Sequence, residues 1–265
     1  MINFMVANAR KGHHKYGQES VETILKAQIE NSLDLEWNPD SILILANFDF
    51  EFMGVKTVKW QPNKHCWTGS KMFGVDHIFS NKNEFRLAGE IIWSHDLDCW
   101  ENNQIDCPPD IKDVGITTYS TSKFNGGSIF WRYSARDIVN VIEFLLSEGE
   151  EKEEPTINRV LKSKKFRDRV TVVDNTYNVG CSGFVKRYNR SEKPVKVLHF
   201  NPMNKISWET HGLDRNRLGE IAVSERLENL LRKYYPNLAK ELSSEVVSSC
   251  GRDTVPVQDL PAQGS

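Results

Sequence analysis

The chain has 265 residues, of which 39% are hydrophobic and 26% are charged, and its formal net charge is -2. This composition is ordinary for a globular protein and allows one large α/β domain or two small ones. No stretch approaches the roughly 20 apolar residues of a membrane span, and the N-terminus lacks the pattern of a secretion signal. We therefore expect a cytoplasmic protein with no transmembrane segment.

Strand and helix signals alternate at the start of the chain. Residues 2–9 form an apolar, strand-like run, residues 20–33 place apolar side chains on one helical face, and residues 41–46 are a second apolar run after a break at Pro39. This β-α-β order predicts an α/β fold with a parallel sheet covered on both faces. In such sheets, ligands bind beyond the C-terminal ends of the strands.

Helical patterns also occur later in the chain. Ser134 and Asp137 have the spacing of a capping box before an apolar face over residues 138–146. A last amphipathic helix is predicted to start after Gly219 and to run until Pro236. Residues 243–265 are polar and aperiodic, so we expect a disordered tail.

Two segments suggest a metal and diphosphate site. Asp96 and Asp98 end the apolar run of residues 91–95, and His199 follows another apolar run, with Lys205 six residues beyond it. Two carboxylates and an imidazole can hold a divalent cation, and a lysine can neutralise a phosphate. A simpler explanation is that one Asp caps a turn while His199 is a hydrogen-bonded core residue.

Cysteine and charge patterns give weaker signals. The five cysteines are odd in number and scattered without CxxC spacing, which favours reduced thiols over disulfides or a zinc cage. Residues 159–196 carry eleven Lys or Arg against three acids, a net charge of +8. This segment is either a solvated face or a surface for an anionic partner.

Four segments resemble glycosyltransferases of the GT-A fold, family 8, which includes glycogenin and lipopolysaccharide galactosyltransferases. Residues 91–98 look like the strand and DxD motif, and residues 124–129 look like the FNxGvxxxN stretch. Residues 153–158 occupy the place of the DQDxLN segment, and His199 with Lys205 and Trp208 parallels the HFxGxxKPW signature. The order agrees across roughly residues 1–210.

The departures from the family pattern concern two of these segments. Pro202 stands where the family has glycine and Ile206 where it has proline, and Trp208 comes one position late. Glu153 and Glu154, followed by proline, replace the acid-glutamine-acid signature. The identity of the residue beside the anomeric carbon therefore stays open between these two glutamates, and we favour Glu154.

The resemblance implies a GT-A mixed sheet with helices on both faces, in a single domain over residues 1–242. Residues 1–100 would bind the nucleotide sugar and residues 101–242 the acceptor. Asp96, Asp98 and His199 would bind Mn²⁺ or Mg²⁺, with Glu154, Glu153 and Lys205 as candidate catalytic residues. The implied donor-binding residues are Ala7, Asn8, Tyr16, Asn47, Asp49 and Lys205, and the implied sugar and acceptor pocket consists of Asn125, Gly126, Gly127 and Asn178.

The implied activity is transfer of a hexose from a nucleotide sugar, such as a UDP-sugar, to an acceptor hydroxyl with retention. The acceptor could be an anionic glycan, a lipid or a hydroxylated base in DNA. Two other classes stay open: a nucleotidyltransferase that makes nucleotide sugars, and a non-catalytic carbohydrate or nucleic-acid binding protein. The first would need a glycine-rich loop after the first strand, where the chain has a single glycine, Gly12.

Overall fold

The computed structural model of the protein describes residues 1–12, 17–61, 70–85, 87, 90–120, 123–149, 152–180, 184–201 and 222–236. Tyr16, Lys205 and Trp208 lie outside these residues, as does the tail predicted over residues 243–265. The roles that the sequence suggests for them stay predictions.

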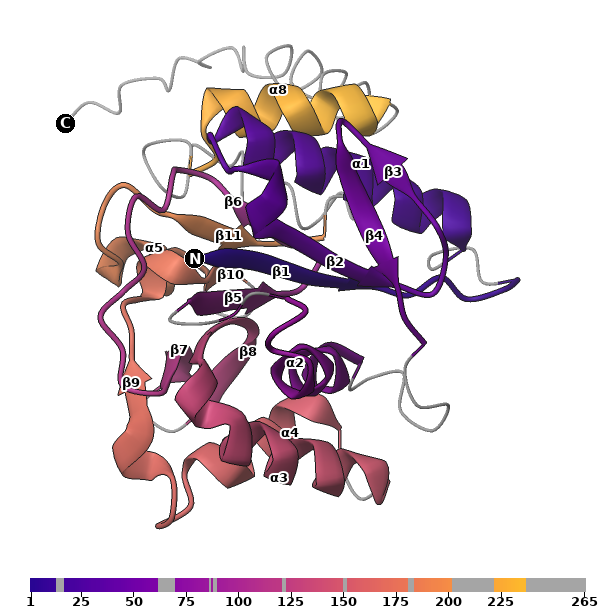
Figure 1. The fold of residues 1–265 in the computed structure, drawn as a ribbon. Helices are drawn as coiled ribbons and strands as arrows, with labels where there is room; N and C mark the ends of the chain where they lie inside the picture. Colours follow the sequence, from indigo (N-terminus) through magenta and orange to yellow (C-terminus); the bar gives the residue numbers. More distant parts are fainter. Residues whose placement is uncertain are drawn as a thin grey trace, which may run out of the picture.

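Groups of strands are separated by helices along the chain (Figure 1). The strands are β1 (Ile2–Ala7), β2 (Ile42–Ala46), β3 (Glu51–Phe52), β4 (Val55–Lys59), β5 (Ile91–His95), β6 (Cys99–Glu101), β7 (Val114–Ser120), β8 (Lys123–Arg132), β9 (Val170–Val172), β10 (Val179–Gly180) and β11 (Val197–His199). The α-helices are α1 (Gln18–Asp34), α2 (Ser70–Ser80), α3 (Arg136–Ser147), α4 (Glu153–Leu161), α5 (Phe184–Arg190) and α8 (Glu225–Tyr234).

The main sheet has eight strands in the order β3-β4-β2-β1-β5-β8-β7-β9. Strands β4, β2, β1 and β5 pair in parallel, as the sequence predicts. Strand β8 instead pairs antiparallel with both β5 and β7, so the sheet is mixed. Since β7 and β8 follow each other within two residues, a crossover between them is impossible and the antiparallel pairing results.

Alternate residues of the central strands face opposite helical layers, as expected for a sheet buried on both faces. Phe4 and Leu45 belong to the core cluster that includes the apolar faces of α2, α3 and α4. Their neighbours Met5 and Ile44 pack instead with α1. Figure 1 shows α1 on one side of the sheet and α2, α3 and α4 on the other.

A second, three-stranded sheet has the order β10-β11-β6. Trp100 of β6 and Leu198 of β11 join a core cluster with apolar residues of α1 and α8. Helix α1 is thus shared between the two sheets, and α8 lies next to it (Figure 1). This arrangement fixes β6 and β11 against the rest of the fold.

The predicted capping box of α3 is wrong. The N-cap residue is Ala135, which makes no side-chain cap hydrogen bond. Ser134 donates its hydroxyl hydrogen bond to Asp113, and Asp137 accepts two hydrogen bonds from Arg169. Both side chains therefore tie α3 to the β7 and β9 region rather than to its own backbone.

Helix α8 begins later than predicted. Its N-cap is Ser224, whose side chain accepts a hydrogen bond from the backbone N–H of Leu227. The helix therefore starts at Glu225 rather than just after Gly219, and it ends at Tyr234, before Pro236 as the sequence indicates.

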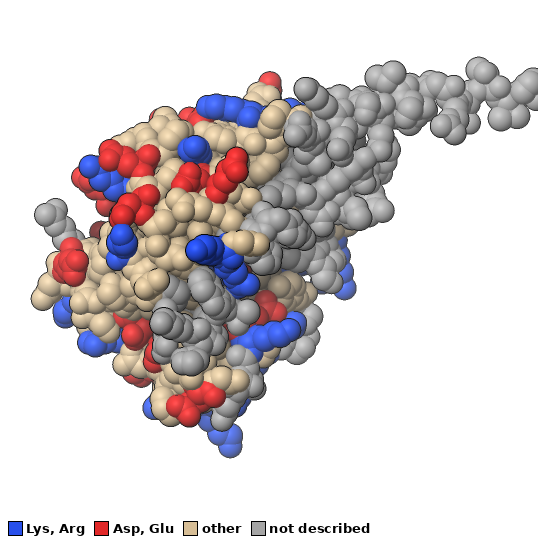
Figure 2. Space-filling view, turned by 90° about the vertical axis from the view of Figure 1, so that its right-hand side faces the viewer, with Lys and Arg blue, Asp and Glu red and all other residues tan. Residues whose placement is uncertain are grey.

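None of the helices in the described part of the chain is both long and apolar enough to span a membrane. On the face shown in Figure 2, acidic and basic side chains are interspersed. This mixture agrees with the small net charge of the chain.

Candidate metal centre and active site

The turn between β5 and β6 carries Asp96 and Asp98. Hydrogen bonds of its backbone hold this turn in place. The N–H of Asp96 donates to the carbonyl of Gly127 at 2.8 Å, and the N–H of Cys99 donates to the carbonyl of Asp96 at 2.9 Å. The carbonyl of Asp98 accepts from the N–H of Phe200 at 2.9 Å, and the carbonyl of Leu97 accepts from the side chain of Gln28 in α1. Because these bonds fix the backbone of the turn, they also fix where the side chains of Asp96 and Asp98 leave it.

His199 ends β11 and faces both carboxylates. Its Nε2 atom lies 3.3 Å from Oδ1 of Asp98 and 4.0 Å from Oδ2 of Asp96. Burial acts to raise the pKa of the Asp98 carboxyl, but the facing His199, a backbone hydrogen bond and Lys71 together lower it below its ordinary value. The structure therefore brings together the three side chains that the sequence singles out, from segments about a hundred residues apart.

Two glycines make room for His199, one beside its imidazole and one beside its backbone carbonyl. A Cβ atom on Gly127 would lie 2.3 Å from Cε1 of His199, and one on Gly180 would lie 2.0 Å from its carbonyl oxygen. Neither approach is tolerated by any residue with a side chain. On its other side, Nδ1 of His199 lies 3.2 Å from Oδ1 of Asn178. A hydrogen bond from Nδ1–H to this oxygen would orient the ring so that Nε2 is the ligand atom on the side of the carboxylates.

The sequence analysis missed Lys71, in the first turn of α2. Its side chain is only 6% exposed, and Nζ lies 2.6 Å from Oδ1 of Asp96 and 3.2 Å from Oε1 of Glu153. Nζ also donates to the carbonyl of Gly126. Burial would lower the pKa of Lys71, but the two carboxylates raise it above its ordinary value, so the ammonium stays charged.

Glu153 and Glu154 begin α4 and point to different partners. Burial raises the pKa of Glu153 to about 6, against the lowering effect of Lys71. Oε2 of Glu154 accepts a hydrogen bond from Tyr119 Oη at 3.0 Å and lies 3.4 Å from the backbone nitrogen of Gly126. Of the two, Glu153 is the residue linked to the aspartate pair, through Lys71.

The cluster has the chemistry of a divalent cation site. The cluster holds three carboxylates, those of Asp96, Asp98 and Glu153, beside the ammonium of Lys71 and the imidazole of His199, so acidic groups are in excess. A dication would offset this excess, since carboxylates so close together repel each other. Ligand atoms about 2.1 Å from an ion and at right angles lie roughly 3 Å apart, close to the 3.3 Å between Nε2 of His199 and Oδ1 of Asp98. The residues therefore fit manganese or magnesium.

Three candidate side-chain amides have buried atoms without hydrogen-bond partners among the described residues. They are both side-chain atoms of Asn8, Nδ2 of Asn125 and Nδ2 of Asn178. Buried polar groups are normally satisfied, so these atoms are available to a polar ligand. All three residues are among those that the family resemblance assigns to the donor or the sugar pocket.

No protein-family model matches the chain, and no curated protein matches its sequence. Solved structures do match its fold. The galactosyltransferase LgtC, solved in complex with donor and acceptor sugar analogs, has a TM-score of 0.51 and 12% sequence identity, over 87% of this chain and 100% of LgtC. The glycosyltransferase GlyE of Streptococcus pneumoniae TIGR4 has a TM-score of 0.51 and 11% identity, over 89% of this chain and 64% of GlyE.

The chain has the GT-A glycosyltransferase fold. At these identities the likeness concerns the fold alone, and it confirms the predicted mixed α/β architecture. Four of the predicted donor residues, Ala7, Asn8, Asn47 and Asp49, lie at or just beyond the ends of β1 and β2 in this GT-A sheet. Ala7 is the last residue of β1 and is fully buried.

The other two described donor candidates already have partners. Oδ1 of Asn47 accepts from the backbone N–H of Ala9, and its Nδ2 donates to the Ala9 carbonyl, both at 2.9 Å. Asp49 is exposed and pairs with Lys59 at 2.8 Å. Asn47 thus positions the segment after β1, next to Asn8.

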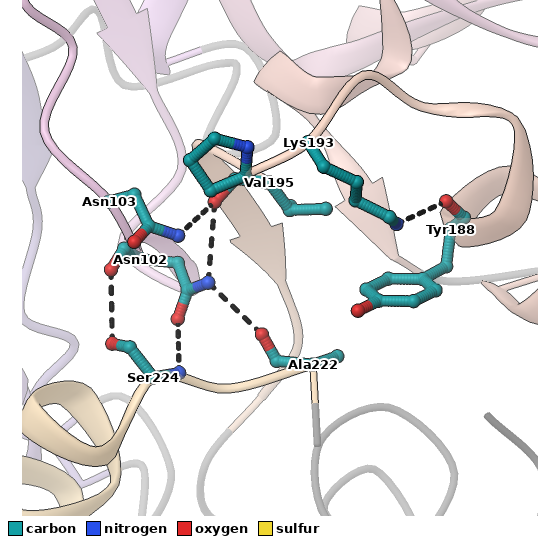
Figure 3. A pocket seen from close by; sticks show the side chains of 8 residues that line it. Asn102, Asn103, Tyr188, Lys193, Val195, Ala222 and Ser224 are labelled. Atoms are coloured by element: carbon teal, nitrogen blue, oxygen red, sulfur yellow. Dashed lines mark hydrogen bonds between the residues drawn. The ribbon is translucent and has the colours of Figure 1, made fainter. Parts of the chain in front are cut away.

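Asn102 anchors the far end of β6 (Figure 3). Its Nδ2 donates to the carbonyls of Val195 at 3.3 Å and Ala222 at 3.0 Å, and its Oδ1 accepts from the backbone N–H of Ser224 at 2.7 Å. These bonds connect β6 to the start of β11 and the N-terminus of α8. They border a cavity of about 440 Å³, none of whose lining residues belongs to the aspartate and histidine cluster.

Proposed function

We propose that the protein is a metal-dependent glycosyltransferase that moves a hexose from a nucleotide sugar, a UDP-sugar by the family resemblance, to an acceptor hydroxyl. The observation that carries this proposal is the meeting of Asp96, Asp98 and His199 at one point of a GT-A fold. LgtC, which shares the fold, is a galactosyltransferase whose structure holds donor and acceptor sugar analogs. Residues 1–242 would form the single domain that carries this activity.

Asp96, Asp98 and His199 would hold Mn²⁺ or Mg²⁺, which supplies positive charge where the nucleoside diphosphate leaves. The ammonium of Lys71 orients the Asp96 carboxylate, because it lies 2.6 Å from Oδ1 of that residue. Lys205, beyond the described residues, is proposed to share the charge of the leaving group. Interactions that strengthen as the leaving group gains charge lower the barrier.

The residue beside the anomeric carbon is proposed to be Glu153 rather than Glu154. Glu153 connects to the aspartates through Lys71, at 3.2 Å from its Nζ, whereas Glu154 bonds to Tyr119. Retention of anomeric configuration follows from the family resemblance. The amide atoms of Asn125 and Asn178 that have no partner among the described residues support binding of sugar hydroxyls.

The basic segment over residues 159–196 gives only limited support to an anionic acceptor, because several of its charges have internal partners. Arg169 pairs with Asp113 and with Asp137. Arg187 is buried and donates to backbone carbonyls, and Lys196 pairs with Asp106. A neutral glycan acceptor therefore fits these contacts as well as a lipid or DNA. Binding that weakens steeply with added salt would favour an anionic acceptor.

The test is a panel of nucleotide sugars, with manganese or with chelator, monitored by thermal shift and by release of nucleoside diphosphate. We expect one nucleotide sugar to raise the melting temperature and to be turned over or slowly hydrolysed only with metal. Asp98→Asn should lower turnover roughly a thousandfold, about 4 kcal/mol of barrier. Asp110→Asn, at an exposed aspartate, is the matched control and should change nothing.

Two results would refute the proposal in different ways. Equal turnover with metal and with excess chelator would remove the metal from the reaction. Binding of a nucleotide sugar without release of nucleoside diphosphate from any donor and acceptor pair would identify a binding protein on the same fold.

A further inference from the structure

Cys99 places a sulfur atom beside the proposed metal ligands. It is the first residue of β6 and pairs directly with His199 of β11 in the antiparallel register. Directly opposite residues of an antiparallel pair project from the same face of the sheet. The ligand atoms of Asp98, Cys99 and His199 accordingly lie within 4.8 Å of one another.

Asp98 and His199 thus belong to two overlapping sets of donor atoms. With Asp96 they offer two oxygens and a nitrogen, and with Cys99 they offer an oxygen, a sulfur and a nitrogen. The carboxylate of Asp96 has a resident cationic partner in Lys71 and lies 4.0 Å from Nε2 of His199. The thiol of Cys99 instead donates a hydrogen bond of 3.0 Å to the carbonyl of Gly127.

The two sets suit different metals. Magnesium and manganese prefer oxygen, whereas zinc and related ions readily take thiolate, imidazole and carboxylate together. Zinc binds sulfur at about 2.3 Å and imidazole nitrogen at about 2.0–2.1 Å, so tetrahedral neighbours lie roughly 3.5 Å apart. Small side-chain rotations bring atoms that are within 4.8 Å of one another to this separation.

We propose that this site has a second mode of metal binding, in which Asp98, Cys99 and His199 hold a thiophilic divalent ion such as Zn²⁺, Cd²⁺ or Co²⁺. The metal–sulfur bond forms as the thiol proton leaves to solvent, and no electron is transferred. Because this mode uses Asp98 and His199, the bound ion excludes manganese. It rests on the proposed function only for the assignment of manganese to the same residues, since thiolate binding itself needs no sugar.

The test is a titration of metal-free full-length protein with Co²⁺, monitored by the sulfur-to-cobalt charge-transfer band in the ultraviolet. We expect the band to saturate at one ion per chain and to disappear on addition of Zn²⁺. Cys99→Ser should abolish it. Cys107→Ser, at an exposed cysteine, is the matched control and should leave it unchanged.

A second variant keeps the test decisive if Cys99→Ser does not fold. It replaces Cys66, Cys107, Cys181 and Cys250 with serine, so that Cys99 is the only thiol. The band should persist in this variant and should be lost when His199→Gln is added. If the folded single-thiol protein with His199 intact binds Co²⁺ without the band, or does not bind Co²⁺, the inference is overturned.

The outcome is independent of glycosyl transfer. Manganese-dependent turnover in a protein that shows no cobalt–sulfur band would overturn this inference and leave the proposed function intact. A cobalt–sulfur band in a protein that turns over no nucleotide sugar would support this inference and overturn the proposed function. Where both hold, Zn²⁺ should inhibit the wild type competitively with Mn²⁺ and should inhibit Cys99→Ser at least tenfold less strongly.

Discussion

Replacing Lys71 by methionine removes the only charged side chain of α2 that contacts both Asp96 and Glu153 in the described structure. Methionine keeps much of the apolar stem but leaves two carboxylates facing each other without the ammonium. Breaking a buried ion pair by removing one partner costs about 3–5 kcal/mol. Because the side chain of Asp96 is 41% exposed, solvent screens part of the loss and we expect about 3 kcal/mol.

The loss should depend on pH, because burial already raises the pKa of Glu153 to about 6. A carboxyl whose folded pKa lies above its unfolded value binds its proton more tightly in the folded state, so stability decreases as pH rises from about 4.5 through 6. Without Lys71 the pKa of Glu153 rises further. If the pKa of Glu153 rises by one unit in Lys71→Met, the loss of unfolding free energy is about 1.4 kcal/mol larger at pH 8 than at pH 5.

The assay is thermal and urea unfolding of wild type and Lys71→Met at pH 5 and pH 8. A loss of about 3 kcal/mol corresponds to a melting temperature lower by roughly 6–12 °C in a chain of this size. Lys59→Met is the matched control, because its exposed pair with Asp49 should contribute at most about 1 kcal/mol. A variant as stable as wild type, or equally destabilised at both pH values, would refute the electrostatic role of Lys71.

Three further substitutions probe the surroundings of His199 and the donor side. Gly127→Ala, whose Cβ would lie 2.3 Å from Cε1 of His199, should weaken Mn²⁺ binding at least tenfold by calorimetry, whereas Gly126→Ala, with its nearest contact at 3.6 Å, should not. Asn178→Ala removes the contact to Nδ1 of His199 and should lower Mn²⁺ affinity about 10–100-fold; unchanged affinity would show that the contact does not orient the ring. Asn8→Ala should leave the free energy of unfolding within about 1 kcal/mol of wild type but weaken nucleoside diphosphate binding about tenfold, and the opposite pattern would make Asn8 a structural residue.

The parts of the fold that follow from local sequence pattern were predictable. Strands β1, β2 and β5 are near-continuous apolar runs, and α1 has its apolar side chains on one face. Each of these elements can therefore be predicted from a short stretch of sequence. The antiparallel pairing of β8 depends on contacts between segments, which periodicity does not encode. Ser134 and Asp137 have the spacing of a cap, but their partners Asp113 and Arg169 are distant in sequence.

In the site, too, some residues could be predicted from local sequence and others depend on contacts between distant segments. Asp96, Asp98 and His199 were identifiable because each follows a strand-like run and matches a family motif in order. Lys71 was not, since its partners Asp96 and Glu153 lie 25 and 82 residues further along the chain, and a single lysine in an apolar helix has no motif. Cys99 was not predicted as a ligand, because zinc sites are recognised in a sequence by two cysteines a few residues apart. Here the strand register places a single cysteine opposite His199.

Direct measurement of Mn²⁺ binding tests the central claim, that three side chains from two distant segments share one divalent cation. Electron paramagnetic resonance reports free Mn²⁺ in titrations of wild type, Asp98→Asn and His199→Gln, with Asp110→Asn as control. We predict one bound ion per chain in wild type and in the control, and affinity at least tenfold weaker in each of the other two variants. Equal binding of Mn²⁺ by all four folded proteins would contradict the account.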